Sequence, residues 1–367
     1  MMECYQHKTF NNHREEVENF RIRLPKIIDL VCNLEEELYG NREYLCNGFD
    51  WIRKLLEYNL IDGKLNRSSL LMVTYRRLNP DANIEQIEQA FILGWCLEMF
   101  QSSFLIVDDI MDNSFRRRNK TCWYRLPNVG QIVCNDAMLM ESIIFQLIRR
   151  TLKHHPNYID IVELLHEGYF KTSFGQCLDL LNAKAFGNFN SDDNTISEID
   201  RYQTIVLNKT AFYSFVMPIK LALFLSNQTD RNTHQSIEEI LMEIGEMFQI
   251  QDDYLDCFGD QNRTGKIGTD IQEGKCTWLL METLKRIAKD SEQLKIFNEY
   301  YGTENIEPIK EIYFKLELPK LFEQYQSAKI ESIKEKIEQF KVKNKHWYSE
   351  SIDIFSVPLE QIHQRNR

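Results

Sequence analysis

Two groups of aspartates share one spacing that could bind metal ions. The pattern Asp-Asp-x-x-Asp occurs at residues 108–112 and again at 252–256. On a helix, side chains four residues apart lie on one face, so the first and last aspartate of each group would point the same way. Carboxylate oxygens are the ligands that Mg²⁺ prefers, and Mg²⁺ usually shares them with the phosphates of a substrate. The repeated pattern therefore predicts a magnesium-dependent site that acts on a phosphorylated molecule.

Basic residues follow both aspartate groups. Arg116, Arg117 and Arg118 come shortly after the first group, and Lys266 follows the second. A guanidinium suits bidentate binding of phosphate, so these cations favour a diphosphate as the ligand. Two plainer interpretations stay open: the aspartates could be exposed helix ends, and the arginines could form surface ion pairs of little energetic value. A calcium-binding EF-hand does not fit, because there is no glycine-centred loop of acidic residues.

Each aspartate group ends an apolar stretch with helical periodicity. Residues 91–112 are apolar on nearly all sides, which predicts a helix buried in the centre of a bundle. In 236–256 apolar residues recur at helical spacing, and Ser236 with Glu239 predicts a capping box at the start of that helix. Only 14 glycines and 8 prolines interrupt the 367 residues, and strand signals are weak. These features predict an all-α fold that forms one large domain.

The composition narrows the classes of protein to which the chain could belong. The formal net charge of -11 disfavours general binding to nucleic acid or to an anionic membrane. We find no run of about 18 apolar residues and no signal-peptide-like segment at the amino terminus, so we expect no membrane span and a cytoplasmic location. The nine cysteines form no CxxC pair, as is typical of a reduced intracellular protein.

The motifs, taken in order, resemble those of the farnesyl diphosphate synthase family. The matching segments are DGKLNRS, LGWCLEMFQSSFLIVDDIMD with the RRRNKTCWY that follows, LNKTAFYSFVMP, FQIQDDYLD and TGKIGTDIQEGKCTWLL. The resemblance implies the isoprenoid synthase fold, a single-domain all-α helical bundle around a central cavity. It places a catalytic domain at 41–367 after an N-terminal helical extension at 1–40. It also implies a homodimer and, as cofactor, about three Mg²⁺ ions per active site.

The resemblance assigns roles to individual residues around an allylic prenyl diphosphate. The residues expected to hold the metal ions are Asp108, Asp109, Asp112, Asp252, Asp253 and Asp256, the last two in a supporting role. Those expected to bind the allylic diphosphate are Arg117, Lys209, Gln176, Lys266 and Lys275. Those expected to take part in catalysis are Lys209, Thr210, Lys266 and Gln249.

The chemistry implied for such a site follows from charge. Diphosphate is a poor leaving group from carbon until cations stabilise the negative charge that develops as the C–O bond breaks. The allylic cation left behind needs a dry cavity lined by aromatic side chains. The candidates for this product pocket are Ser103, Phe104, Phe212, Tyr213 and Phe248. Each of these aromatic residues could also belong to the ordinary core.

Elongating members of the family bind isopentenyl diphosphate in a second, metal-free cradle. The matching residues here are Gly63, Lys64, Arg67, Gln101, Arg118 and Arg365. Around them the chain departs from the family pattern, because Asp62, Ser68 and Asn119 stand where the family has glycine. Asp62 would place a negative charge beside the second diphosphate, and serine or asparagine restricts the backbone more than glycine does. Ser103 occupies a position that is often aromatic in the family.

These departures leave three functions open. Because they gather at the second cradle and the product pocket, the sequence favours an enzyme that ionises farnesyl or geranyl diphosphate and forms a terpene. Such terpene synthases, derived from farnesyl diphosphate synthases, are known in insects. The alternative is a prenyltransferase that condenses isopentenyl diphosphate with an allylic diphosphate to give geranyl, farnesyl or geranylgeranyl diphosphate, since the cradle cations survive. A minor alternative is a non-catalytic partner subunit.

Overall fold

The described part of the chain folds almost entirely into helices. The computed structural model describes residues 13–39, 46–183, 194–260, 268–288, 291–345 and 352–364. Within them, the sheet consists of one two-stranded hairpin, which confirms the prediction of an all-α fold. The chain divides into two compact units, each built from segments that are not contiguous in the sequence. The first unit comprises residues 1–164, 218–229 and 350–354, and the second comprises the remainder.

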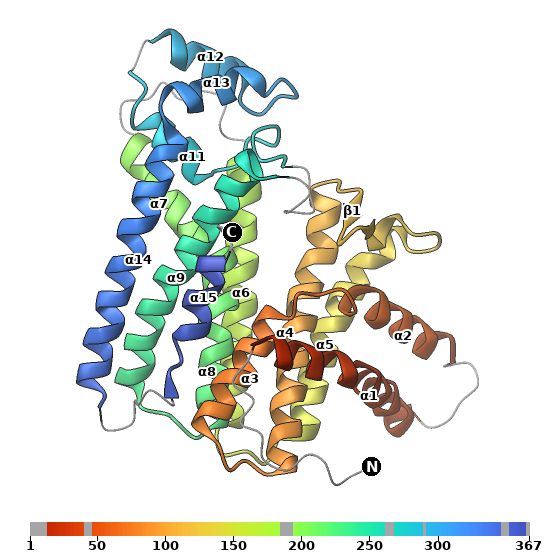
Figure 1. Cartoon of the computed structure of the whole chain (residues 1–367). Coiled ribbons are helices and arrows are strands. Elements are labelled where there is room, and N and C mark those ends of the chain that lie inside the picture. The colour runs from red at the N-terminus through yellow and green to blue at the C-terminus, as the bar shows by residue number, and fades with distance from the viewer. Residues whose placement is uncertain are drawn as a thin grey trace. The chain divides into compact units, whose positions relative to one another are not determined.

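The first unit is organised around α4 (Ile84–Met111). Its other elements are α1 (His13–Tyr39), α2 (Cys46–Leu60), α3 (Asn66–Leu78), β1 (Arg116–Arg117), β2 (Lys120–Thr121), η2 (Trp123–Arg125), η3 (Gly130–Ile132), α5 (Val133–Leu152), the start of α6 (Tyr158–Ala183) and most of α8 (Met217–Leu225). Helix α4 packs against α5, α3, α2 and α1 (Figure 1). Its residues from Ala90 to Phe100 are buried without a break, as predicted for a helix at the centre of a bundle.

The N-terminal helix α1 contributes to the same core. Phe20 is fully buried, and its ring centroid lies 4.8 Å from that of Phe91 and 5.9 Å from that of Trp95. Gly94 makes this contact possible, because a Cβ at that position would lie 2.5 Å from the Phe20 ring. Helix α1 is therefore a core helix of the first unit. The domain boundary expected at residue 40 stays a prediction.

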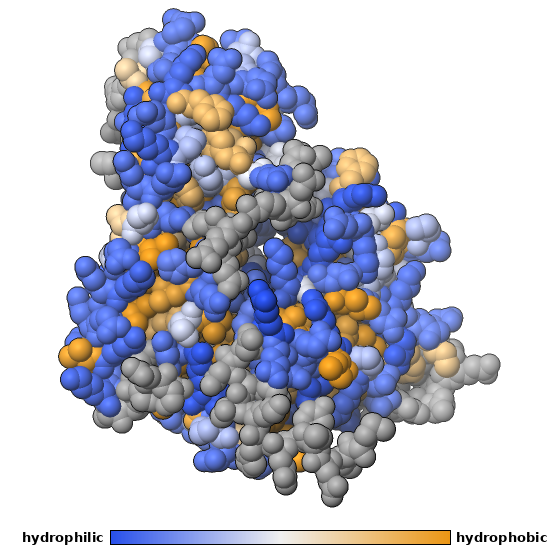
Figure 2. All heavy atoms as spheres, in the orientation of Figure 1, coloured by the Kyte–Doolittle hydropathy of each residue, from blue (hydrophilic) through white to orange (hydrophobic). Residues whose placement is uncertain are grey.

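Two helical segments, Ile84–Met111 and Gly130–Leu152, are long and apolar enough to cross a membrane. The first of them contains most of the apolar stretch 91–112 that the sequence predicts as a buried core helix. In the first segment 78% of the apolar window is buried inside the protein, and in the second 39%. A mostly buried core helix passes the same test, so these segments are weak evidence for a membrane span. On the face shown in Figure 2, hydrophilic residues dominate and hydrophobic residues form smaller groups.

The second unit is organised around α9 (Arg231–Phe258) and η4 (Leu207–Val216). Its other elements are the remainder of α6, α7 (Asn194–Val206), α11 (Trp278–Leu284), α12 (Glu292–Tyr300), α13 (Glu307–Lys315), α14 (Leu318–Lys343) and α15 (Ser356–Gln364). The segment η4 is a π-helix that packs closely along α9. At their crossing a Cβ on Gly245 would lie 2.4 Å from the Cβ of Ala211, so only glycine allows this approach.

Helix α9 begins earlier than the sequence predicted. Its N-cap is Asp230, whose carboxylate accepts a bond from the Thr233 backbone N–H at 2.8 Å. Ser236 lies inside the helix, so the capping box predicted at Ser236 and Glu239 is wrong. The Glu239 carboxylate instead accepts a bond from Gln235 Nε2 at 3.1 Å. The apolar stripe that follows is buried as predicted, with its residues at Ile237, Ile240, Leu241, Ile244 and Met247.

Candidate active site

A two-residue turn carries one of the arginines that follow the first aspartate group. Strands β1 and β2 are antiparallel, with Arg117 opposite Lys120. Arg118 and Asn119 form the turn, and both have positive φ, at 51° and 61°, as a type I′ turn requires. Asparagine tolerates this left-handed region better than most residues. Asn119 therefore occupies a position where the family has glycine without loss of the turn.

The first aspartate group lies at the carboxyl end of α4. Asp109 is buried, and its Oδ1 accepts a bond from Arg117 Nε at 2.7 Å. Asp108 lies 3.7 Å from Arg117 Nη2, and Asp112 caps the helix through its backbone N–H. Both of these residues are only partly buried. Arg117, predicted to bind the allylic diphosphate, is thus placed beside the carboxylates predicted to hold its metal ions.

Protein groups surround the carboxylate of Asp109. Burial raises its pKa, and the Arg117 guanidinium opposes that rise. The Cys122 thiol is hydrogen-bonded to the same carboxylate, and burial with this neighbouring negative charge raises the pKa of Cys122 to about 12. The thiol therefore stays protonated at neutral pH and donates a hydrogen bond to the carboxylate. Asp109 is held by two donors from the hairpin region.

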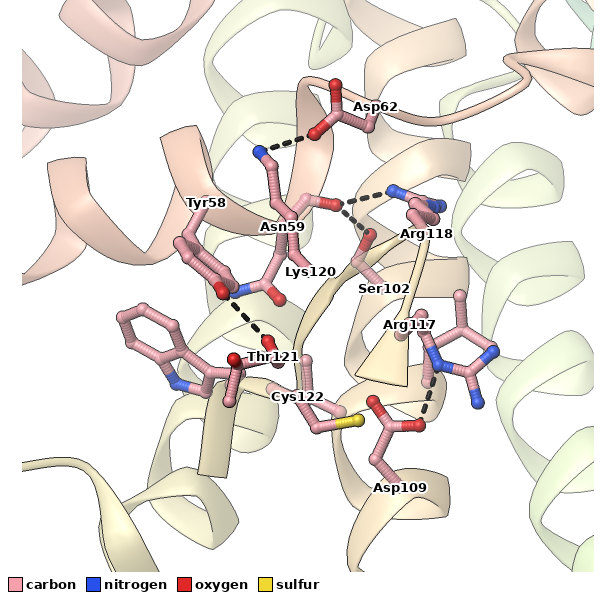
Figure 3. Close-up of a pocket in the computed structure, with 13 residues that line it drawn as sticks. Tyr58, Asn59, Asp62, Ser102, Asp109, Arg117, Arg118, Lys120, Thr121 and Cys122 are labelled. Atoms are coloured by element: carbon pink, nitrogen blue, oxygen red, sulfur yellow. Dashed lines mark hydrogen bonds and ion pairs between the residues drawn. The ribbon is translucent and has the colours of Figure 1, made fainter. Parts of the chain in front are cut away.

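Near its carboxyl end, helix α4 carries polar residues on two different faces. The α4 residues that line a small pocket between the hairpin and α2 are Ser102, Leu105, Ile106 and Asp109 (Figure 3). The predicted site residues that share the neighbouring face by their spacing are Gln101, Phe104, Asp108 and Asp112. The pocket in Figure 3 is therefore distinct from the face that carries the two more exposed aspartates.

The predicted second cradle is partly assembled within the first unit. Gly63 is buried against Arg118, because a Cβ at residue 63 would lie 3.5 Å from both Nη atoms of Arg118. Arg118 Nη1 also donates to the backbone oxygen of Asn59 at 2.8 Å. The other cradle residues in the described part of the chain are Lys64, which is exposed, and Arg67 and Gln101, which are half-buried.

Positive charge gathers around Arg118. Burial lowers the pKa of the Arg118 guanidinium, the buried Glu98 carboxylate opposes this, and the nearby Arg117 and Arg67 guanidiniums lower it further. The Glu98 and Asp62 carboxylates also act on Arg118, and Arg117 is paired with Asp108 and Asp109, so the protein itself offsets part of the repulsion among the three guanidiniums. A bound diphosphate would relieve this repulsion, so the arrangement suits the predicted cradle.

Asp62 is not an isolated negative charge. Its carboxylate forms an ion pair with the Lys120 ammonium of β2. From the sequence, Asp62 is expected to repel the second diphosphate, but in the structure the Lys120 cation offsets its charge. Ser68, another departure from the family pattern, is buried at the start of α3, where its N–H donates to Glu98 Oε1 at 3.1 Å and its hydroxyl to Leu65 O at 3.0 Å.

The second aspartate group lies at the carboxyl end of α9. One of its aspartates is buried and two are half-buried. Asp253 is buried and accepts three bonds of 2.8 Å, from the Tyr202 hydroxyl, Gln249 Nε2 and the Trp278 backbone N–H. Burial raises the pKa of Asp253 to about 7 despite these donors. Asp253 is therefore bonded to donors of the protein itself, and the supporting role expected for it stays a prediction.

The other two aspartates of this group are half-buried. Asp252 and Asp256 lie four residues apart and so share a face of α9. Asp256 Oδ1 accepts the backbone N–H of Asp270 at 3.0 Å, which ties the loop before α11 to the end of α9. Gly268 allows this approach, because a Cβ there would lie 1.9 Å from the Asp256 backbone oxygen.

Lysines predicted to bind the allylic diphosphate meet at one carboxylate that the sequence analysis missed. Asp179 is buried on α6, and its Oδ2 lies 2.5 Å from Lys209 Nζ and 3.5 Å from Lys275 Nζ. Burial raises the pKa of Asp179, but the two lysines outweigh this effect and leave the pKa lowered. Spacing could have indicated Asp179, because it lies one turn after Gln176, a predicted site residue that is also buried.

Two of the catalytic candidates in the described part of the second unit, Thr210 and Gln249, are connected by a hydrogen bond. Thr210 Oγ1 donates to Gln249 Oε1 at 2.8 Å, and Gln249 Nε2 donates to Asp253. Lys209 and Thr210 both lie in the π-helix η4. Lys266 of the second unit and Arg365 at the carboxyl end were also predicted as site residues, but they lie outside the described residues.

The candidate pocket aromatics differ in their surroundings. Phe212 is fully buried, with the Lys171 ammonium 3.8 Å above its ring centroid. Phe248 packs edge-on against Phe215 at 5.3 Å, and Tyr213 is half-buried. The remaining candidates lie in the first unit: Phe104, whose ring centroid is 5.1 Å from that of Phe100, and Ser103, which is buried with its hydroxyl on the Phe100 carbonyl oxygen at 2.7 Å. Their role as a product pocket stays a prediction.

The carboxylates of the two aspartate groups are chemically suitable ligands for Mg²⁺. Among the described residues, no group of three or more His, Cys, Asp or Glu side chains is arranged to hold a metal ion. Each aspartate group instead supplies two partly buried carboxylates on one helix face, Asp108 with Asp112 and Asp252 with Asp256. Mg²⁺ is commonly bound by one or two carboxylates together with waters and substrate phosphates. Such paired carboxylates are therefore compatible with ions that a diphosphate helps to hold.

Comparison with known proteins identifies the family. A family profile described as polyprenyl synthetase matches residues 49–316. The chain is 40% identical over 320 residues to the farnesyl pyrophosphate synthase of Bos taurus, covering 85% of this chain and 88% of the relative. It is 42% identical over 318 residues to that of Homo sapiens, covering 85% and 74%, and 36% identical over 360 residues to that of Saccharomyces cerevisiae, covering 94% and 98%. The chain belongs to the polyprenyl synthetase family.

Proposed function

We propose that the protein is a chain-elongating prenyltransferase of the farnesyl diphosphate synthase type. It joins isopentenyl diphosphate to an allylic prenyl diphosphate and releases inorganic diphosphate. The observation that carries this proposal is the geometry around Arg118, where Gly63 lies against both Nη atoms of the guanidinium and the Asn59 oxygen accepts from Nη1, an arrangement that suits a second diphosphate. The relatives support it, because all three are farnesyl pyrophosphate synthases.

The aspartates bind the cofactor in this proposal. Asp108 and Asp112 in the first unit, and Asp252 and Asp256 in the second, are the residues that would hold Mg²⁺. The ions, when bound, neutralise charge on the allylic diphosphate and so make it a better leaving group. Asp109 and Asp253 act indirectly, since each is already bonded to protein donors.

The basic residues stabilise the charge that develops during the reaction. Arg117, Lys209 and Lys275 bind the allylic diphosphate and stabilise the negative charge that grows as the C–O bond breaks. The electron pair of that bond leaves with the diphosphate. The double bond of isopentenyl diphosphate, held by the cradle around Arg118, then forms the new C–C bond, and the resulting cation loses a proton. Gln249 fixes the hydroxyl of Thr210, which follows Lys209 in η4.

The terpene synthase that the sequence favoured is the weaker candidate. Its main support was that Asp62, Ser68 and Asn119 would weaken the second cradle. The ion pair of Asp62, the left-handed turn at Asn119 and the buried bonds of Ser68 accommodate each departure. The similarity to farnesyl pyrophosphate synthases also supports elongation rather than cyclisation or quenching of the cation. A non-catalytic partner subunit is disfavoured by the retention of both aspartate groups.

One assay separates the three functions. The purified protein is incubated with Mg²⁺ and geranyl or farnesyl diphosphate, with and without isopentenyl diphosphate. We expect a prenyl diphosphate longer by one isoprene unit, formed only when isopentenyl diphosphate is present. A hydrocarbon or alcohol formed in its absence would favour the terpene synthase, and the absence of any turnover with metal present would favour the partner subunit.

Asp179 offers a test of the allylic diphosphate site. The substitution Asp179→Asn removes the charge that orients Lys209 and Lys275, so we expect the KM for the allylic diphosphate to rise about tenfold, since losing one partner of a buried charge pair is costly. Steady-state kinetics with each substrate varied in turn would measure this. The control is Glu331→Gln, which removes the exposed pair with Lys334 at 2.6 Å on α14 and should change neither KM. An unchanged KM in Asp179→Asn would remove Asp179 from the site.

The product, the oligomeric state and the location remain predictions. Ser103, where the family often has an aromatic residue, could admit a chain longer than farnesyl. A homodimer is supported by an exposed apolar face of α6, where Phe170, Phe174 and Leu181 are 71%, 46% and 63% exposed and the two phenylalanine rings stack at 6.1 Å. We retain the expectation of a cytoplasmic protein that binds no nucleic acid.

A further inference from the structure

The hairpin that carries Arg118 is fastened to the carboxyl end of α2. The Tyr58 hydroxyl donates to the Thr121 backbone oxygen at 2.7 Å. One turn later, Asp62 forms its ion pair with Lys120. The Lys120 ammonium also lies 5.3 Å from the centroid of the Tyr58 ring. Figure 3 shows these contacts on β2, which follows the turn directly.

Arg118 depends on the same helix end. Its Nη1 donates to the backbone oxygen of Asn59, which lies in the last turn of α2. Carbonyl groups in the last turn of a helix lack intrahelical donors, and a cation there is favourable. The Ser102 hydroxyl shares this oxygen at 3.3 Å. The direction of the Arg118 side chain is therefore set by how closely the hairpin approaches α2.

The turn is too short to let Arg118 move independently of Lys120. Arg117 pairs with Lys120 in the hairpin, and only Arg118 and Asn119 lie between them. A type I′ turn fixes both backbone dihedrals of its two central residues. A contact that fixes the position of Lys120 therefore also fixes the backbone from which Arg118 projects.

We propose that Asp62 and Lys120 form a positioning pair that holds the hairpin against α2 and thereby sets the affinity of the Arg118 cradle for isopentenyl diphosphate. The substrate named here rests on the proposed function, whereas the effect on the hairpin does not. The pair is neutral as a whole, so it acts on the cradle through position and adds no net charge to it. Asp62 is thus a positioning residue rather than a repulsive one.

The expected effect is moderate. Asp62 and Lys120 are each 41% exposed, and ion pairs of this kind change an equilibrium by up to about fivefold. We expect Asp62→Asn or Lys120→Gln to raise the KM for isopentenyl diphosphate about three- to fivefold. The KM for the allylic diphosphate should change less than the KM for isopentenyl diphosphate, because Arg117 is also held by Asp109 and the lysines of the second unit are untouched.

A double-mutant cycle isolates the pair. The double variant with Asp62→Asn and Lys120→Gln should be no worse than either single variant, because each removes the same interaction. The charge-swapped variant with Asp62→Lys and Lys120→Asp should recover most of the lost affinity. The matched control is Asp29→Asn, which breaks the Asp29–Arg53 pair between α1 and α2 at 2.8 Å with similar exposure and should leave every parameter unchanged.

Hydrogen exchange provides a readout that needs no turnover. In Asp62→Asn we expect faster amide exchange in the peptide covering 114–123, where the Cys122 N–H bonds to the Phe115 oxygen at 3.1 Å. Exchange in this peptide should match the wild type in Asp29→Asn. If the wild-type protein shows no elongation, the proposed function fails, and the exchange experiment alone then decides whether the pair positions the hairpin.

Two results would overturn the inference. The first is a KM for isopentenyl diphosphate that falls in Asp62→Asn, because Asp62 would then repel the substrate. The second is unchanged exchange in the hairpin peptide, because the pair would then hold nothing in place.

Discussion

Replacing Asp252 by asparagine is expected to lower turnover about a hundred- to a thousandfold. Asp252 and Asp256 share a face at the end of α9, so the amide removes one of the two partly buried carboxylates that this helix offers to Mg²⁺. An amide oxygen is a weaker ligand for a hard cation than a charged carboxylate. Steady-state kinetics over a range of Mg²⁺ concentrations would show a lower kcat and a higher requirement for the metal.

The control for this variant lies on the same helix. Glu239→Gln changes an exposed carboxylate of α9 that bonds only to Gln235 among the contacts described, and it should leave turnover and metal requirement unchanged. Circular dichroism should show that both variants unfold close to the wild-type temperature, because Asp252 is only half-buried and its replacement keeps the three donors of Asp253. Turnover above about a tenth of wild type in Asp252→Asn would contradict a direct role in metal binding.

Replacing Gly175 by alanine is expected to destabilise the protein by about 3 kcal/mol or more. A Cβ on Gly175 would lie 2.3 Å from the backbone nitrogen of Lys209 and 2.7 Å from its Cα, so α6 and η4 would have to move apart. The neighbouring atoms belong to backbone and cannot rotate away. Because Lys209 and Thr210 lie at this crossing, activity should fall together with the midpoint of urea unfolding.

The substitution Gly48→Ala is the matched control for Gly175→Ala. Gly48 lies near the start of α2, and a Cβ there would meet nothing within 4 Å. Alanine at this position should leave stability unchanged or raise it by about 0.5–1 kcal/mol, because alanine loses less backbone entropy in a helix. If Gly175→Ala unfolds at the same urea concentration as Gly48→Ala, the close approach of α6 and η4 is not required for stability.

The sequence predicted those parts of the fold and site that depend on local periodicity. The helices that end in the two aspartate groups follow from apolar residues at helical spacing, and Ala90 to Phe100 are buried as expected. The start of α9 was placed too late, because the Ser236 and Glu239 pattern is a valid capping signal that competes with Asp230. Only the packing of the first turns of α9 decides between the two.

The motif does not show which aspartates of each group are buried and bonded to the protein and which stay partly exposed. Asp252 and Asp253 are neighbours, yet Asp253 is buried because Tyr202 and Trp278, both distant in sequence, supply donors to it. Asp179 was missed for a related reason, since its partners Lys209 and Lys275 come from two other segments. Interactions between distant segments leave no periodic signal in a single sequence.

The substitutions near the second cradle show how a sequence comparison can mislead when each position is judged alone. Asp62 looked unfavourable as a single change from glycine, but its effect depends on Lys120, which lies in another element. Asn119 looked restrictive, but its φ of 61° falls in a region that asparagine adopts readily. The consequence of each departure depends on the neighbours that the fold supplies.

The first unit is built from three separate segments of the chain, and this has a consequence for its folding during synthesis. This unit takes up residues 218–229, including the fully buried Ile219 and Leu221, and also residues 350–354, where Arg77 donates to the carbonyl oxygen of Asp353. Domains generally fold as units while the ribosome delivers them from the amino terminus. A nascent chain of this protein cannot complete its first unit until residue 354 has been synthesised, so part of the apolar surface of that unit has to remain covered by other means until then.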